Sequence, residues 1–220
     1  MSPPLSTARI ATVYDRLGAR VDRLAPCEDP AREELIAHGA FEGARSVLEV
    51  GCGTGRFARR LLAEHLPDDA AYLGVDVSTT MVRLARERLL PWSERAEVRH
   101  TTGAPHLGVP AGAFDRVVAT YVLDLLSEDD ARALLREAHR LLGPDGLLCL
   151  AGLTEGVTPV ARLVSGIWAA VFAVRPERVG GCRPIRLAVL LDPDHWVIRH
   201  HRVLTRFGIS SEAVVAAPAG

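Results

Sequence analysis

A glycine-rich turn between a short apolar run and an amphipathic segment restricts the fold of this chain more than any other feature. The run SVLEV occupies 46–50, the turn GCGTG follows it, and apolar residues recur at helical spacing from Arg56 onward. A short β-branched run predicts a buried strand, and helical periodicity predicts a helix with one apolar face. The sequence therefore predicts a strand, a tight glycine turn and a helix in succession.

The alternation of strand and helix patterns continues downstream. Apolar runs predict strands at 71–77, 97–101, 114–121 and 147–153. Helix patterns run from Ser78, which stands in the position of an N-cap, to Leu90, and from about Glu128 to Leu142, where GPDG is a stop signal. Because parallel strands need helical crossovers, this order predicts an α/β, Rossmann-like fold with a mostly parallel sheet and helices on both faces.

The last third of the chain has a different pattern. Residues 159–174 predict a helix that is apolar over much of its circumference and too short to span a bilayer, so no membrane insertion is expected. The strand-like runs at 196–207 and 210–217 meet at Gly208. Two such runs around a glycine predict an antiparallel C-terminal hairpin that closes the edge of the sheet.

The organisation of the chain is predicted to be a single domain. A length of 220 residues, without an internal repeat or a low-complexity linker, fits one core. Within it we expect an N-terminal helical lid at 1–43, a ligand-binding core at 44–153, a substrate or lid insertion at 154–195 and the closing hairpin at 196–220. The net charge of -1 gives no general attraction to nucleic acid, which is not an expected partner.

Composition excludes several kinds of chemistry. Lys, Asn and Gln are absent, and this excludes a lysine Schiff base, a pyridoxal lysine and a Walker-type phosphate lysine. The four cysteines are scattered, so neither a metal site nor a disulfide framework is predicted. This cysteine pattern fits a reducing environment, and a cytoplasmic location is therefore expected. The N-terminal residues lack the pattern of a signal peptide.

Two acidic residues define the ligand that the glycine turn would hold. Asp76 ends the second predicted strand, where a carboxylate can accept both hydroxyls of a ribose. Glu49 lies two positions before Gly51, where it would repel a pyrophosphate and favour a cationic group. The spacing Gly-x-Gly-x-Gly also departs from that of pyrophosphate binders. Together these features indicate a positively charged adenosine ligand without phosphates, which describes S-adenosylmethionine.

The motifs in this part of the chain resemble those of one large enzyme family. VLEVGCGTGRF at 47–57 resembles the first motif of the class I S-adenosylmethionine-dependent methyltransferases. LGVDVSTTMVRLARERL resembles their second motif, FDRVVATYVLDLL their fourth, and REAHRLLGPDGLLCLAG the following helix and strand. The resemblance covers about 44–152 and is greatest to the group of ubiquinone and menaquinone C-methyltransferases and other small-molecule methyltransferases. It implies a seven-stranded sheet with a reversed terminal hairpin.

The resemblance also assigns residues to the parts of the cofactor. Backbone atoms of Gly51, Cys52 and Gly53 would line its methionine part. Glu49 would orient the amino group, through a water molecule, and Asp76 would hold the ribose. Asp76 also lies where it could cap the next helix beside its N-cap serine, and this alternative remains open.

The adenine is expected to lie between two segments. Val77 and Met81 would pack against it, although core packing within the helix is an equal alternative for Met81. The family usually offers an Asp after the third strand, but here the aligned residues include Gly103 and Ala104, and no acid is present. Backbone groups at these two positions, or His106, would then recognise the adenine.

The catalytic assignment rests on the end of the fourth strand, because open α/β sheets bind ligands at the carboxyl ends of their strands. Thr120 would lie beside the cofactor, and Tyr121 and Asp124 would be near the transferred methyl group. Asp124 is the candidate for a base, with a cap of the following helix as its alternative. Tyr14 resembles the first tyrosine of the family's lid and would cover the cofactor or the acceptor, or else pack as an ordinary helix residue.

Acceptor specificity is expected in the segments without family motifs. The apolar helix that carries Trp168 and the loop that carries Arg183 would form a hydrophobic lid with one guanidinium for an acidic acceptor. Such a lid suits a small aromatic, hydrophobic or lipid-like molecule. The apolar helix is equally consistent with ordinary core or with the interface of a homodimer.

The sequence is also consistent with two other classes of function. A nicotinamide-dependent oxidoreductase would share the Rossmann-like fold. A protein that binds S-adenosylmethionine without catalysis would also fit the missing adenine acid.

Overall fold

The computed structural model describes residues 4–104 and 106–219. Seven strands form one sheet in the order β3-β2-β1-β4-β5-β7-β6. Its strands are β1 (Ser46–Val50), β2 (Ala71–Asp76), β3 (Ala96–His100), β4 (Phe114–Thr120), β5 (Leu142–Leu153), β6 (Trp196–Arg206) and β7 (Ile209–Pro218). Strands β1 to β5 are parallel to one another, and β7 pairs antiparallel with both β5 and β6. The predicted fold class and terminal hairpin are confirmed.

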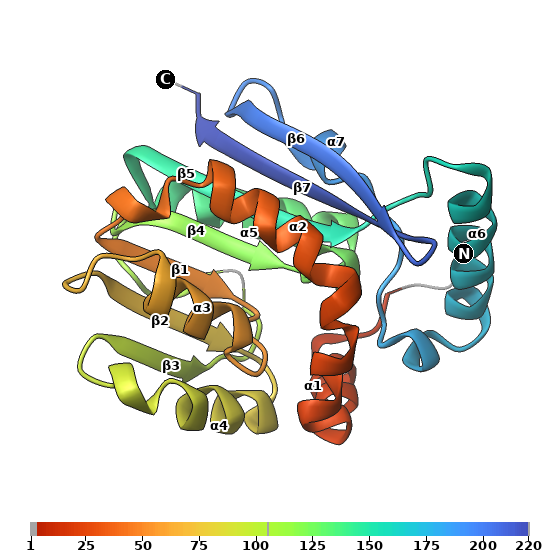
Figure 1. Cartoon of the computed structure of the whole chain (residues 1–220), viewed down its shortest axis with the longest axis horizontal. Coiled ribbons are helices and arrows are strands. Elements are labelled where there is room, and N and C mark those ends of the chain that lie inside the picture. Colours follow the sequence, from red (N-terminus) through yellow and green to blue (C-terminus); the bar gives the residue numbers. More distant parts are fainter. Residues whose placement is uncertain (1–3, 105, 220) are drawn as a thin grey trace.

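Helices cover both faces of the sheet, as Figure 1 shows. The α-helices are α1 (Thr7–Leu17), α2 (Ala25–His38), α3 (Arg56–Glu64), α4 (Thr79–Arg88), α5 (Glu128–Leu141), α6 (Pro159–Val174) and α7 (Leu187–Leu190). Short 3-10 turns are η1 (Gly18–Leu24), η2 (Phe41–Gly43), η3 (Leu90–Trp92), η4 (Leu123–Leu125) and η5 (Pro176–Val179). Helix α6 stands beside the tip of the β6–β7 hairpin, at the right of the view.

Two apolar layers hold the helices on the sheet. Because neighbouring residues of a strand point to opposite faces, Val47 packs in the layer of α2, α3 and α4, and Leu48 packs in the layer of α5 and α7. Leu35 and Leu61 fill the first layer, and Leu135 belongs to the second. Each full burial of such a side chain contributes about 1.5–3 kcal/mol.

The helix starts follow the predicted chemistry. The hydroxyl of Ser78 accepts a hydrogen bond from the backbone N–H of Met81, which makes it the N-cap of α4.

At the hairpin turn, Phe207 and Gly208 both have positive φ, the backbone form that matches the twist of a two-stranded ribbon. Among the described residues, no helix combines the length and the apolar character needed to span a membrane.

One predicted boundary is wrong. The segment 143–146, expected to be a loop before the fifth strand, lies inside β5. Leu142 already pairs with Phe114 of β4, and the register resumes at Leu147 opposite Arg116 after an irregularity. The turn residues themselves have no partner on β4, and they lie within the strand because the residues on both sides of them pair with β4.

Candidate active site

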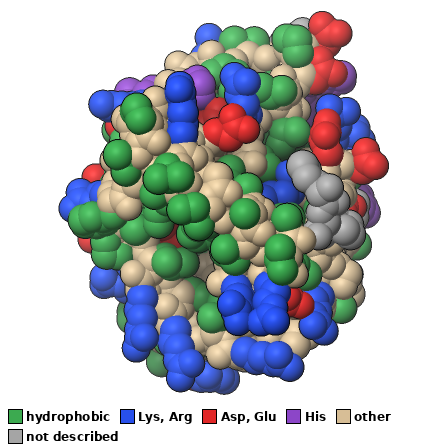
Figure 2. All heavy atoms as spheres, turned by 90° about the vertical axis from the view of Figure 1, so that its right-hand side faces the viewer, with side chains coloured by type: hydrophobic (Ala, Val, Ile, Leu, Met, Phe, Trp, Pro, Cys, Tyr) green, Lys and Arg blue, Asp and Glu red, His purple; other side chains and the backbone are tan. Residues whose placement is uncertain are grey.

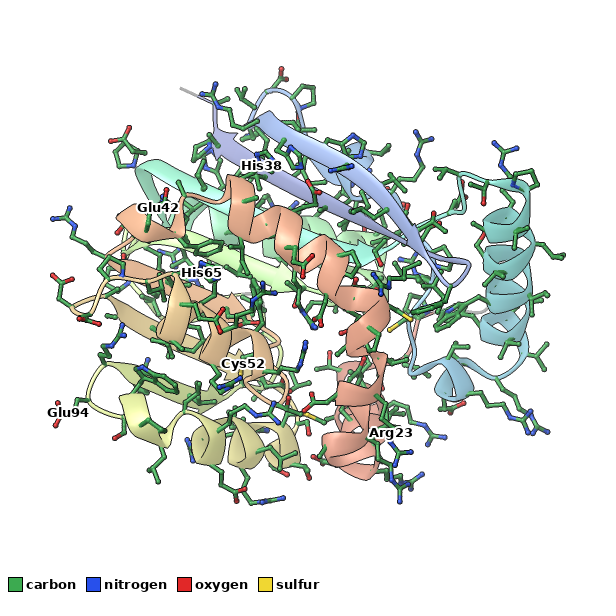
Figure 3. All side chains as sticks on the ribbon, viewed as in Figure 1. Arg23, His38, Glu42, Cys52, His65 and Glu94 are labelled. Carbon is green, nitrogen blue, oxygen red and sulfur yellow. The ribbon has the colours of Figure 1, made fainter. Side chains whose placement is uncertain are left out.

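A pocket opens at the carboxyl ends of β1, β2 and β4, below a roof formed by α1, η1 and the start of α2. It brings together most of the residues that the sequence singled out: Tyr14, Glu49, Gly51, Cys52, Gly53, Asp76, Val77, Met81, Gly103, Ala104, Thr120 and Tyr121. The lining does not include Asp124, Trp168 or Arg183. Figure 3 labels Cys52, which follows β1 in the glycine turn.

The glycine turn is fixed by backbone contacts. Gly51 has a φ of 69°, and a Cβ on it would lie 2.3 Å from Cγ2 of Val122, so a side chain is excluded here. The N–H groups of Gly51 and Cys52 both donate to the carbonyl oxygen of Val75, at 2.8 and 3.1 Å. These two donors are therefore already used inside the protein and are not offered to a phosphate.

Asp76 is held at the end of β2 by the chain around it. Its Oδ2 accepts from the N–H of Gly53 and its Oδ1 from the N–H of Ser78, each at 2.9 Å. Burial raises the pKa of this carboxyl, and these hydrogen bonds oppose the rise. A carboxylate has about four acceptor sites, so both oxygens can still accept from the hydroxyls of a diol.

Glu49 is almost completely buried, with 1% of its surface exposed. Its Oε2 accepts a 2.6 Å hydrogen bond from the hydroxyl of Tyr72 on the neighbouring strand β2. Burial raises the pKa of Glu49 to about 7, and the Tyr72 hydrogen bond and the charge of Arg32 act in the opposite direction. A positively charged ligand group beside Glu49 would stabilise the ionised form of this buried carboxyl group.

Arg32 is a pocket residue that the sequence analysis missed. Its Nη1 lies 2.9 Å from Oε2 of Glu28, and its guanidinium lies 5.5 Å from the centre of the Tyr121 ring. Its buried Nε has no hydrogen-bond partner among the described residues. In the sequence, Arg32 reads as the partner of a glutamate four residues earlier on a helix surface, so no signal marked it. In the structure the Arg32 side chain lines the pocket and brings a positive charge to it.

The roof of the pocket is attached by two aspartates. Asp15 of α1 accepts hydrogen bonds from the Ser78 hydroxyl at 2.6 Å and from the N–H of Thr80 at 2.9 Å. Asp22 of η1 accepts from Thr54 at 2.7 Å and from Arg88 at 2.8 Å. Asp15 therefore joins α1 to the start of α4, and Asp22 joins η1 to the glycine turn and to the end of α4.

His106, the side chain expected to recognise the adenine, does not lie at the pocket. His106 is 69% exposed, its Nδ1 lies 3.2 Å from Oε1 of Glu137, and it does not line the pocket. Gly103 has a φ of 80°, and a Cβ on it would lie 2.4 Å from Cγ2 of Thr7. Asp130 at the start of α5 also lines the pocket, which the sequence analysis did not foresee.

Part of the pocket lining forms a mostly apolar wall. It contains Ile10, Val21, Ala25, Val122, Leu125 and Leu126. Glu28 and Tyr14 are its polar members, and burial raises the pKa of both groups. The Tyr14 hydroxyl lies 3.8 Å from Sγ of Cys182.

The two residues predicted to be catalytic lie differently. Tyr121 has a φ of 59° and lines the pocket, but its hydroxyl donates to Oγ of Ser211 at 2.8 Å. Asp124 is fully buried in η4, and its Oδ2 accepts from the N–H of Leu153 at 3.2 Å. Burial raises its pKa to about 7, and its Oδ1 has no partner among the described residues. The alternative that Asp124 caps α5 is wrong, because Ser127 is the N-cap of that helix.

Trp168 and Arg183 connect α6 to the rest of the protein. The indole Nε1 of Trp168 donates to the carbonyl of Cys182 at 2.9 Å, and Nη2 of Arg183 donates to the carbonyl of Leu126 at 2.7 Å. The outer side of α6 exposes apolar residues, namely Val160, Leu163, Ile167 and Val174. Figure 2 shows this side of the molecule, where hydrophobic side chains gather and arginines lie along the lower edge.

Comparisons with known proteins agree with this geometry. Residues 47–146 match a family model described as a methyltransferase domain. A malonyl-[acyl-carrier protein] O-methyltransferase of Geobacter sulfurreducens is 34% identical over 67% of this chain and 54% of its own length. A tRNA1(Val) (adenine(37)-N6)-methyltransferase of Tolumonas auensis is 32% identical over 68% of this chain and 69% of its own length.

A solved structure has the same fold. The N-methyltransferase NodS from Bradyrhizobium japonicum, in complex with S-adenosyl-L-homocysteine, superposes with a TM-score of 0.72 at 18% identity, over 96% of this chain and 99% of that one. The chain spans only about half the length of the first curated relatives it matches, 54% in the G. sulfurreducens protein and 50% in a second malonyl-[acyl-carrier protein] O-methyltransferase from Laribacter hongkongensis.

Proposed function

Because the chain belongs to the class I S-adenosylmethionine-dependent methyltransferases, we propose that it methylates a small, predominantly apolar acceptor that binds between α1, α2 and η4. The observation that carries the proposal is the pocket itself. It places Asp76, Glu49 and Arg32 along one cavity that continues into an apolar wall.

The residues of the pocket fit S-adenosylmethionine part by part. Asp76 keeps free acceptor sites for the ribose hydroxyls, and buried Glu49 suits the ammonium of the methionine part. The guanidinium of Arg32, which lines the same pocket, suits the carboxylate beside that ammonium. When bound, this cofactor supplies a methyl carbon activated by a sulfonium, so alignment and exclusion of water are the main contributions of the protein.

The nicotinamide alternative fits the pocket less well. A pyrophosphate is usually held by backbone N–H groups at a glycine turn. Here the N–H groups of Gly51 and Cys52 bind Val75, and that of Gly53 binds Asp76. Glu49 would in addition repel the phosphates. These contacts support the methyltransferase proposal over an oxidoreductase.

The apolar wall supports a hydrophobic or aromatic acceptor with one polar group. Among the acidic side chains of the pocket, Glu28 belongs to α2 beside Arg32, and burial raises its pKa above the ordinary value while the charge of Arg32 opposes the rise. We therefore assign to Glu28 the proton that an acceptor hydroxyl or amine must lose. Asp124 is the alternative base. Because it does not line the pocket, it could act only on an acceptor that extends past the lining residues. The ring of Tyr121, which does line the pocket, would align the acceptor.

The relatives agree on the reaction but differ in their acceptors. Their names specify a malonyl group on a carrier protein and an adenine of a tRNA. The acceptor is therefore proposed from this chain alone. We propose that α6, attached through Trp168, and the loop with Arg183 form one border of the acceptor entrance.

Incubation with cofactor labelled in the methyl group tests the proposal. A panel of phenols, quinols, amines, carboxylic acids and lipids would be supplied, and mass spectrometry would detect products heavier by one CH2. Labelled product from an apolar acceptor is expected, and Glu28→Gln should reduce its rate when that acceptor is a phenol or an amine. Binding of nicotinamide dinucleotide without binding of S-adenosylhomocysteine would contradict the proposal. Binding of S-adenosylhomocysteine with no product from any panel member would favour a non-catalytic binding protein.

A further inference from the structure

Two histidines and a glutamate meet on the surface between α2 and β6, away from the pocket. Glu34 and His38 lie one helical turn apart on α2, and His200 lies on β6. Each residue offers one ligand atom, and these atoms lie within 4.8 Å of one another. Figure 3 labels His38 on the part of α2 that runs beside β6.

A bulge in β6 directs His200 toward α2. The pairing with β7 shifts between Ile198 and His200, so that Arg199 has no partner and His200 lies opposite Val215. Val215 belongs to the apolar layer that packs under α2. Since cross-strand partners share a face, His200 points to the side of α2, while His201 points to the other side and meets Glu212.

The distances within the cluster match those between ligands of one metal ion. Nε2 of His200 lies 2.9 Å from Oε2 of Glu34, and Nε2 of His38 lies 3.7 Å from the same oxygen. Two donors bound to a tetrahedral zinc ion at about 2.0–2.1 Å lie roughly 3.3 Å apart, a value between these two distances. The imidazole rings of His38 and His200 are stacked, with 3.6 Å between their centroids and 14° between their planes, so one ring must turn about its side-chain bonds before both nitrogen lone pairs point at one ion.

The other oxygen of Glu34 is already occupied. Oε1 accepts a 2.6 Å hydrogen bond from Nη1 of Arg202, which leaves Oε2 directed at the two histidines. The cluster is also open to solvent, because 46% of the His38 side chain is exposed, against 13% for Glu34 and 19% for His200. Water can therefore complete the coordination of an ion.

We propose that Glu34, His38 and His200 form a binding site for a divalent transition-metal ion such as zinc. Two imidazole nitrogens and one carboxylate oxygen suit zinc, copper or nickel, whereas magnesium and calcium prefer oxygen ligands. The bound ion joins α2 to the edge strand β6. Since α2 also carries Glu28 and Arg32, the ion would hold the wall of the cofactor pocket in place.

The test measures zinc binding and stability of the full chain without a polyhistidine tag, after treatment with a chelator. Calorimetric titration with zinc should give one ion per chain, and a concentration of zinc 100 times the dissociation constant should raise the melting temperature by about 5 °C or more. Magnesium at the same concentration should have no such effect. His38→Ala, His200→Ala and Glu34→Gln should each weaken zinc binding at least about tenfold.

His195→Ala provides the matched control, because His195 is an exposed histidine paired with an aspartate elsewhere on the surface. Its zinc affinity should equal that of the unchanged protein. If a variant without His38 and His200 still binds one zinc ion with unchanged affinity, for example through cysteines, the proposed site is refuted. Absence of stoichiometric zinc binding in the unchanged protein refutes it as well. Neither result bears on methyl transfer, because the readouts do not involve the cofactor.

Discussion

The hydroxyl of Tyr72 donates a 2.6 Å hydrogen bond to Oε2 of Glu49 inside the sheet, and both side chains are buried. The bond joins two adjacent parallel strands where the pocket begins. It stabilises the charged form of Glu49, but burial outweighs it and leaves the pKa of Glu49 at about 7. The protonation state of the pocket therefore changes near neutral pH.

This arrangement predicts that cofactor affinity depends on pH. Glu49 is protonated below its pKa and cannot attract an ammonium, so the affinity for S-adenosylhomocysteine should rise about tenfold between pH 6 and pH 8. Calorimetric titration with S-adenosylhomocysteine at several pH values measures this affinity. In Glu49→Gln the affinity should be lower at pH 8 and this dependence should disappear, while exposed Glu42→Gln should behave like the unchanged protein. Retention of the full dependence in Glu49→Gln would assign it to another group.

Arg32 is predicted to recognise only one part of the cofactor. Arg32→Ala should weaken binding of S-adenosylhomocysteine about 10- to 100-fold, the range for a hydrogen bond between charged groups. It should leave the affinity for methylthioadenosine nearly unchanged, because that ligand lacks the amino-acid carboxylate. Asp76→Ala should weaken both ligands, since both contain the ribose. Equal losses for the two ligands in Arg32→Ala would contradict the assignment of Arg32.

We expect the affinity for S-adenosylhomocysteine to depend on the absence of a side chain at Gly103. Gly103→Ala would place a Cβ 2.4 Å from Thr7 and displace the start of α1 from the pocket, so the affinity for S-adenosylhomocysteine should fall about tenfold or more. Gly108 has a similar positive φ of 66° but nothing within 4 Å of its Cβ position, so Gly108→Ala carries the backbone strain without the clash. The double variant with Thr7→Ala should recover part of the lost affinity. A similar loss in Gly108→Ala would indicate strain in the loop instead.

Asp124 is predicted to destabilise the protein at high pH. Its folded pKa of about 7 lies above the ordinary value of 3.8, so stability is retained at low pH and lost as pH rises through 7. Asp124→Asn should therefore increase the free energy of unfolding at pH 8 by about 2–4 kcal/mol, with a much smaller change at pH 5. Urea denaturation at both pH values measures this, and Asp69→Asn on the surface serves as the control.

Measuring kcat of the same variant separates the effect of Asp124 on stability from an effect on catalysis. If Asp124 is the base, Asp124→Asn should lower kcat while it raises stability. If Glu28 is the base, kcat should persist in Asp124→Asn and fall in Glu28→Gln. A variant at Asp124 with unchanged stability at pH 8 would show that its carboxyl group ionises without cost in the folded protein.

Local patterns predicted the elements well because their causes are local. The capping hydroxyl of Ser78 acts within one helical turn, and Gly51 is demanded by a turn between two adjoining elements. The segment 143–146 was assigned to a loop because its residues favour a turn; it has no partner on β4, but Leu142 before it and Leu147 after it both pair with that strand.

The sequence by itself determined the order of strands and helices, the glycine turn and the acid at the end of the second strand, because periodicity and turn chemistry depend on neighbouring residues. Only the tertiary structure brought Arg32 to the pocket, paired Tyr72 with Glu49 and placed His200 beside His38. These contacts join residues on different elements, and burial then sets their charge states. Neither distance nor burial is encoded in the spacing of residues along the chain.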